Sequence, residues 1–129
     1  MNNLKDLAIS LAAKVSKVSI TERQVGDVSI LDIEGNIITG ESAQTVRGLI
    51  RRLLAEGRRK ILLNLAQVRW VDSEGLGELV SALVAVTREG GQITLLKVRG
   101  NIREVLEITG LDAIFAIYED ELEALNDYL

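Results

Sequence analysis

The chain of 129 residues contains no cysteine, no histidine and no proline. Without cysteine it has no disulfides, thiol nucleophiles or cysteine zinc ligands. Without histidine it lacks the usual general base of Ser-His-Asp and Cys-His catalysis, and the commonest ligand of transition metals. We therefore expect no enzyme activity, no catalytic residues, no metal site and no cofactor.

Long apolar runs and aromatic residues are scarce as well. No run of about 18 apolar residues is present, which predicts no transmembrane segment. The start, Met1–Asp6, lacks the charge and hydrophobic order of a secretory signal, so a cytoplasmic protein is expected. The net charge is −4 and aromatics make up 3%. The basic cluster between Arg51 and Lys60 has no aromatic residue among its members, so nucleic acid is not an expected partner.

Apolar stretches alternate with helical patterns along the chain. The hydrophobic content of 47% suits one compact domain, which we place at 17–129. Such alternation predicts an α/β fold with a mixed, mostly parallel sheet flanked by helices. The expected strands lie near 18–25, 28–34, 60–65, 93–98 and 114–118. The expected helices carry Ala43–Leu54, Leu76–Val84 and Ile102–Ile108, with a closing helix at Glu119–Leu129.

Residues 1–16 have a helical pattern of their own. Apolar residues recur at i, i+3, i+4, i+7, i+8 and i+11, and this spacing predicts an additional amphipathic helix. The apolar residues are Leu4, Leu7, Ala8, Leu11, Ala12 and Val15. Three surfaces could cover this stripe: the domain itself, a second copy or partner protein, or a membrane. Homodimerisation through this helix is therefore one alternative. The membrane is least favoured, because the polar face carries only two lysines.

The segment Val71–Gly77 contains the candidate functional site. A short, nearly continuous apolar run, Lys60–Leu65, precedes it, as in a strand covered on both faces. The helical pattern that starts at Leu76 follows it. Ser73 therefore falls at a helix N-terminus beyond the carboxyl end of a strand, where unpaired N–H groups and the helix dipole favour an anionic group such as phosphate. The alternative is that Asp72 and Ser73 only cap the helix.

Three other features near this segment have weaker functional interpretations. Gly75-Leu76-Gly77 lacks the third glycine of a dinucleotide-binding motif. Glu74 and Glu78 could form an acid pair or a metal site, although acidic residues in a first helical turn usually stabilise the helix. Trp70 is either a core or rim aromatic or part of a docking surface.

The sequence Asp72-Ser73-Glu74-Gly75-Leu76-Gly77 after an apolar strand resembles the signature of the STAS domain in bacterial anti-sigma-factor antagonists. The resemblance runs from about Val18 to Leu125, with further family-like features at Glu34-Gly35, Asn64-Leu65, Gly90-Gly91 and Ile108–Leu111. It implies a non-catalytic partner-switching protein in which Ser73 is the phosphorylation site. The implied partner-binding residues are Asp72, Ser73, Glu74, Gly75, Leu76 and Gly77.

The same resemblance implies two protein partners. One is an anti-sigma factor that is also a serine kinase with the histidine-kinase-like ATPase fold, and the other is a serine phosphatase. Binding of the unmodified protein would free a sigma factor, and phosphorylation would end that binding. A phosphate would add about −1.5 to −2 charge beside Asp72 and Glu74, which is unfavourable in a desolvated interface.

The chain departs from the family pattern at two positions. Asn36 follows Gly35 where close members carry an acidic residue, on an expected loop near the site. Glu74 occupies the position after the acceptor, where a second serine or threonine is common. Two alternative functions remain: a STAS subunit of a membrane transport or lipid-trafficking complex that is not phosphorylated, and an enzyme that uses the carboxylates near Ser73.

Overall fold

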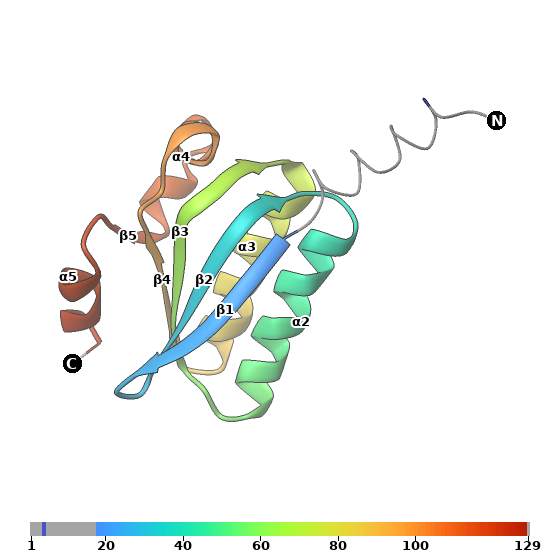
Figure 1. Cartoon of the computed structure of the whole chain (residues 1–129). Helices are drawn as coiled ribbons and strands as arrows, with labels where there is room; N and C mark the ends of the chain where they lie inside the picture. The colour runs from blue at the N-terminus through green and yellow to red at the C-terminus, as the bar shows by residue number, and fades with distance from the viewer. Residues whose placement is uncertain (1–3, 5–17, 129) are drawn as a thin grey trace.

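The computed structural model describes Leu4 and residues 18–128. Five strands form one sheet in the order β1-β2-β3-β4-β5 (Figure 1). The β1–β2 pair is antiparallel, and the other three pairs are parallel. The strands are β1 Val18–Val25, β2 Val28–Ile37, β3 Lys60–Val71, β4 Gln92–Leu96 and β5 Ala116–Tyr118. The predicted mixed, mostly parallel α/β sheet is confirmed, whereas the helix predicted over residues 1–16 lies outside the described residues apart from Leu4.

Helices cover both faces of this sheet. Three of them, α2, α3 and α4, supply buried apolar side chains to the larger core on one face. The last helix, α5, covers part of the other face, where Ala124 and Tyr128 pack on Ile30 and Leu62. The helices are α2 Glu41–Ala55, α3 Ser73–Arg88, α4 Gly100–Thr109, the 3₁₀ turn η1 Leu111–Ala113 and α5 Glu121–Asn126. Because α3 follows β3 and precedes β4, its N-terminus lies at the edge of the sheet where the parallel strands end.

The turn between β1 and β2 has the predicted two-residue form. Val25 pairs with Val28, which leaves Gly26 and Asp27 as the turn. Gly26 has a φ of 61°, and Asp27 is not in the positive-φ region. Positive φ at the first turn residue alone is what a type II′ turn requires, and glycine adopts it without steric cost.

Strands β2 and β3 extend well beyond their predicted ends at 34 and 65. Gly35 pairs with Val68, Asn36 with Trp70 and Ile37 with Val71, after register shifts that begin at Asp32. The expectation that Gly35 and Asn36 lie in a loop near the site is therefore wrong. The polar residues in these segments suggested that the strands had ended. In a strand with one exposed face, however, polar side chains alternate with buried ones, so polar residues do not mark its end.

The C-terminal elements are shorter than predicted. Strand β4 ends at Leu96, and β5 begins only at Ala116, because Ile114, the C-cap of η1, still has helical dihedral angles. The last helix starts at Glu121 and not at Glu119. Its start is fixed by the side chain of Asp120, which accepts a hydrogen bond from the backbone N–H of Glu123 at 3.1 Å.

Candidate functional site

Asp72 is the N-cap of α3 and fixes the joint between β3 and that helix. Its backbone is extended, with φ −97° and ψ −175°, as is typical of N-cap residues. Its Oδ1 accepts a hydrogen bond of 2.8 Å from the backbone N–H of Gly75. Its carbonyl accepts the first intrahelical bond, from the N–H of Leu76 at 2.8 Å. We expected unpaired backbone N–H groups at this helix N-terminus. For Gly75 this expectation is wrong, because its N–H is hydrogen-bonded to the Asp72 side chain.

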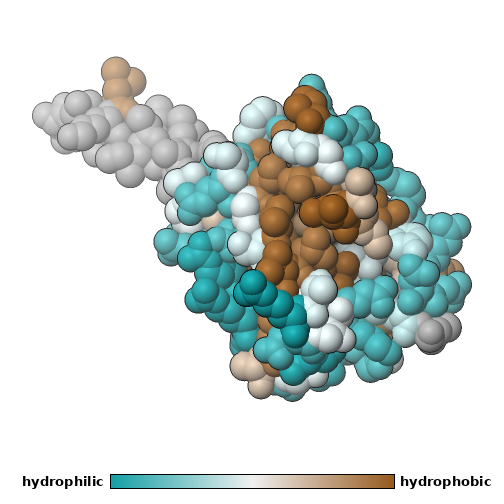
Figure 2. Space-filling view, turned by 180° about the vertical axis from the view of Figure 1, so that it is seen from behind, coloured by the Kyte–Doolittle hydropathy of each residue, from teal (hydrophilic) through white to brown (hydrophobic). Residues whose placement is uncertain are grey.

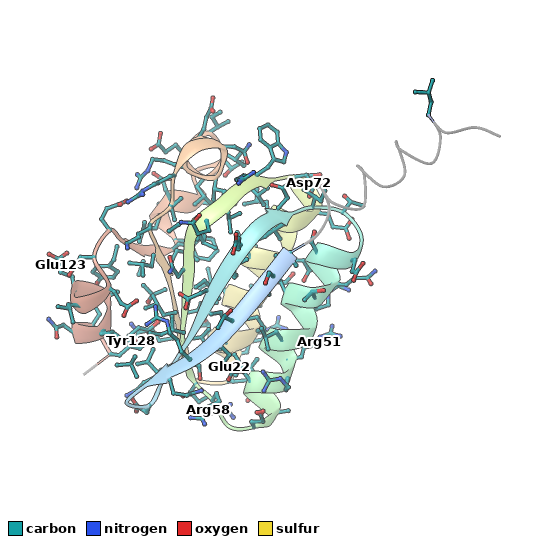
Figure 3. All side chains as sticks on the ribbon, viewed as in Figure 1. Glu22, Arg51, Arg58, Asp72, Glu123 and Tyr128 are labelled. Atoms are coloured by element: carbon teal, nitrogen blue, oxygen red, sulfur yellow. The ribbon has the colours of Figure 1, made fainter. Side chains whose placement is uncertain are left out.

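The second carboxylate oxygen of Asp72 binds the loop that follows β2. The backbone N–H and the hydroxyl of Thr39 each donate a hydrogen bond of 2.8 Å to Oδ2. The backbone N–H of Asp72 also donates to the Ile37 carbonyl, at 3.4 Å. Figure 3 shows Asp72 at the end of the sheet where β2 and β3 finish. The Asp72 side chain thus joins the β2–α2 loop to the start of α3.

These contacts determine the charge state of Asp72. Burial alone would raise the pKa of its carboxyl group. The hydrogen bonds from Gly75, Thr39 and the backbone of Glu74 outweigh burial and lower the pKa below its usual value. Asp72 is therefore a fixed negative charge at neutral pH, directly before Ser73.

Ser73 and Glu74 are the first two residues of α3, and both are exposed. Within the described part of the chain no residue makes a hydrogen bond with the Ser73 hydroxyl. A phosphate on this oxygen would project into solvent next to the carboxylates of Asp72 and Glu74. The helix dipole would favour it, but the nearby donor of Gly75 is used by Asp72. The site is accessible to a modifying enzyme and already negative.

The two glycines of the motif have different environments. A Cβ on Gly75 would lie 1.9 Å from the carbonyl oxygen of Ile37 and 2.9 Å from Cγ2 of Val71. Gly75 therefore allows α3 to pack against the end of β2, and it is buried. Gly77 is exposed, and a Cβ there would meet nothing within 4 Å. The packing of this domain accounts for Gly75 but not for Gly77.

Leu76 and Trp70 border the Ser73 turn. Leu76 is half-buried and packs on the edge of the main core. Trp70, near the end of β3, is 54% exposed. A core position is therefore excluded, and participation of Trp70 in docking stays a prediction. A half-exposed tryptophan three residues before Ser73 is the kind of side chain that contributes strongly to protein–protein contacts.

Glu74 and Glu78 do not form an acid pair or a metal site. Glu78 is buried at 6% exposure, and its Oε1 accepts a hydrogen bond of 2.9 Å from Nε of Arg47 on α2. Among the described residues there is no group of three or more potential ligands that could hold a metal ion. The Arg47–Glu78 ion pair instead joins α2 to α3 and raises the pKa of Arg47. The sequence pattern could have indicated that Glu78 is buried, since it falls on the same helical stripe as the buried Leu79 and Ala82, but it does not indicate Arg47 as the partner.

Comparison with known proteins identifies the family. The STAS domain model matches residues 19–124, which is most of the chain. The chain belongs to the STAS domain family. This confirms the resemblance seen in the sequence, and the match begins and ends within a few residues of the expected limits. None of the helices in the described part has the length and apolar character needed to span a membrane.

Several relatives are named as anti-sigma factor antagonists. A Thermotoga neapolitana protein, named as a homologue of the anti-sigma factor antagonist TM1081, is 40% identical over 74 residues, which are 57% of this chain and 66% of that protein. The anti-sigma F factor antagonist of Paenibacillus polymyxa is 27% identical over 95 residues, 70% of this chain and 81% of its own length. The crystal structure of TM1081 from Thermotoga maritima superposes with a TM-score of 0.74 at 32% identity, covering 84% of this chain and 92% of that one. The comparisons favour the anti-sigma factor antagonist interpretation over the transport-subunit alternative.

Proposed function

We propose that this STAS protein is an anti-sigma-factor antagonist whose binding to its anti-sigma factor is controlled by phosphorylation of Ser73. The observation that carries this proposal is the position of Ser73. Its hydroxyl is exposed at the first turn of α3, directly after a carboxylate that is held negative by its hydrogen bonds. A cytoplasmic location and the absence of catalysis by this chain follow from such a role.

The partner-binding surface is proposed to surround Ser73. Asp72, Ser73, Glu74, Leu76 and Gly77 are wholly or partly accessible at the start of α3, whereas Gly75 supports that surface from below. Exposed Trp70 extends the surface along the end of β3. A partner that covers this area would remove water from the Asp72 and Glu74 carboxylates.

Phosphate at Ser73 would change the energetics of that contact. It adds about −1.5 to −2 charge to a turn that holds two carboxylates. Like charges brought together in a desolvated interface cost several kcal/mol, and about 1.4 kcal/mol already weakens binding tenfold. In the free protein the same phosphate remains in water at a helix N-terminus, where it is tolerated. Phosphorylation would thus weaken the complex without unfolding the protein.

The proposed partners are an anti-sigma factor with serine kinase activity, of the histidine-kinase-like ATPase fold, and a serine phosphatase that reverses the modification. The relatives named as antagonists support an anti-sigma factor as the first partner, whereas its kinase activity and fold are implied by the family resemblance alone. The chemistry of a reversible serine phosphate requires an enzyme of the second kind.

Phosphate incorporation tests the proposal. The wild-type protein incubated with the partner kinase and ATP should incorporate phosphate, and Ser73→Ala should not. Ser81→Ala is a matched control, because Ser81 is an exposed hydroxyl on the same helix whose backbone N–H is already bonded within the helix. It should be labelled as fully as the wild type. Persistent labelling of Ser73→Ala would place the modification elsewhere.

A further inference from the structure

We propose that the cleft between α2 and α3 binds a small zwitterion, namely an α-amino acid with an aliphatic side chain. The cleft has a volume of about 250 Å³. This volume is below the roughly 300–1,000 Å³ of pockets for drug-sized molecules, so the cleft suits a small ligand. Both helices line it, and the side chains that matter are Arg47, Ile50, Arg51, Glu78, Ala82 and Ala85.

The cleft differs from the apolar surface of the molecule. Figure 2 shows an apolar patch bordered by hydrophilic residues on the side of the sheet where α3 lies. Val84 on α3 and Ile108 on α4 are among the exposed apolar side chains. Such a surface offers area but no charged group that would select an occupant. The α2–α3 cleft combines apolar side chains with a few charged ones, as sites for small molecules do.

Glu78 supplies a hydrogen-bond acceptor inside the cleft. The residue is 6% exposed and its carboxylate is bonded on one side only. Nε and Nη2 of Arg47 both donate to Oε1, and within the described part of the chain no donor reaches Oε2. Oε2 is nevertheless not one of the fully enclosed atoms that lack a partner, so it is open to the cleft that Glu78 lines. A charged N–H donor on a ligand would satisfy this oxygen.

Arg51 supplies a cation that the domain does not use. It is exposed and lies one helical turn after Arg47, so both arginines project from the same side of α2 (Figure 3). The next residue, Arg52, forms ion pairs with Glu22 and Glu56, whereas Arg51 has neither an ion pair nor a hydrogen bond among the described residues. A guanidinium group binds a carboxylate through two parallel hydrogen bonds. The free partner of Arg51 is therefore expected to be a carboxylate.

These charges favour a ligand that carries both signs. Arg47 and Glu78 neutralise each other, which leaves the unbonded Oε2 and the Arg51 cation as the two groups to be matched. A simple cation would approach Arg51 unpaired, and a simple anion would approach Oε2 unpaired. Unpaired charges in a desolvated contact are unfavourable. An α-amino acid has an ammonium for Oε2 and a carboxylate for Arg51, and the long Arg51 side chain can adjust to the spacing.

The remaining lining is apolar and small. Ile50 and Ala82 are buried, and Ala85 is half-buried at the border of the cleft. Because two of these three side chains are alanines, space remains between the helices where larger side chains would close it. An aliphatic side chain of the ligand would lose its contact with water there, which favours it over a polar one.

Titration of the full, isotope-labelled chain with L-leucine tests this site without any partner protein. The amide signals of residues 47–51 and 78–85 should shift. N-acetyl-L-leucine lacks the ammonium and L-leucinamide lacks the carboxylate. Each should bind at least about tenfold more weakly than L-leucine, because each loses a charge-assisted hydrogen bond.

Two variants with a matched control complete the test. Arg51→Gln should weaken the binding of L-leucine at least about tenfold. Arg58→Gln should leave it unchanged, because Arg58 lies beyond the end of α2 and outside the cleft (Figure 3). Ala85→Leu keeps every charge but fills the cleft, and it should abolish binding. Thermal melts should show that all three variants are folded, since none of the substituted side chains is buried.

Four results would overturn the proposal. They are unchanged amide signals up to the solubility limit of L-leucine, shifts confined to other parts of the chain, N-acetyl-L-leucine binding as tightly as L-leucine, and equal affinities of Arg51→Gln and Arg58→Gln for L-leucine. If L-leucine does not bind but Arg51→Gln weakens the binding of a protein partner, the cleft is a protein contact and not a site for a small zwitterion.

Discussion

Thr39 and Asp72, 33 positions apart in the chain, are joined by two hydrogen bonds of 2.8 Å to one carboxylate oxygen. One comes from the backbone N–H of Thr39 and the other from its hydroxyl. Because the other oxygen of Asp72 caps α3, a single side chain holds both the β2–α2 loop and the helix start in place. The conformation of the Ser73 turn therefore depends on a residue that is distant in sequence.

Asp72→Ala should lower the free energy of unfolding by about 1–2 kcal/mol, the usual cost of removing an N-cap side chain. Thr39→Val should cost less, about 0.5 kcal/mol, because it removes only the hydroxyl contact and leaves the backbone bond. Chemical denaturation of both variants measures the two values. Equal losses for the two variants would mean that the cap on Gly75 contributes nothing.

The two glycines of the motif should respond in opposite directions to the same substitution. In Gly75→Ala the new methyl group would lie 1.9 Å from the Ile37 carbonyl oxygen, so β2 and α3 must move apart. We expect a loss of about 1–3 kcal/mol or more. Gly77→Ala meets no neighbour within 4 Å and should gain about 0.5–1 kcal/mol from helix propensity. Denaturation curves compare them directly, and a Gly75→Ala protein as stable as Gly77→Ala would refute the close approach of α3 to β2.

Stability should also fall at alkaline pH because of Tyr128. Its hydroxyl donates to the carbonyl of Ile61 in the core beneath α5, and burial raises the pKa of Tyr128 to about 12. An unfolded tyrosine titrates near pH 10. Between these values the unfolded chain has lost a proton that the folded protein retains, so stability decreases as pH rises through this window, by on the order of 2 kcal/mol.

Tyr128→Phe separates this titration from that of other groups. At pH 7 the variant should be less stable than the wild type by about 1 kcal/mol, since it loses the hydrogen bond to Ile61. The difference should shrink or reverse as pH rises toward 12. Thermal melts across this range would contradict the assignment if the two proteins kept a constant difference.

The sheet and the joint at Ser73 could be predicted because both depend on local patterns. Apolar runs that alternate with helical periodicity define the strands and helices, and Asp72 at an N-cap is readable from residue type alone. The extension of β2 and β3 could not be predicted, because the pairing of Asn36 with Trp70 depends on contacts between distant segments.

The electrostatics of the site were the least predictable part. Nothing in the spacing of Thr39 and Asp72 indicates that they meet, although both follow strands that turn out to be adjacent. The sequence shows Glu78 only as one of two acidic residues at the start of a helix, and the fold alone reveals Arg47 as its partner. Each of these contacts joins residues more than 30 positions apart, where a single sequence carries no information on proximity.

Calorimetric titration of Ser73 variants against the proposed anti-sigma kinase tests phosphorylation-controlled binding most directly. Ser73→Ala should bind like the wild type, and Ser73→Asp should bind at least about tenfold more weakly, because its carboxylate is desolvated next to Asp72 and Glu74. Ser81→Asp, which adds the same charge to an exposed position of the same helix, is the control and should bind like the wild type. Thermal melts should show that all three variants are folded. Equal affinities for Ser73→Ala and Ser73→Asp would contradict control of the contact by charge at Ser73.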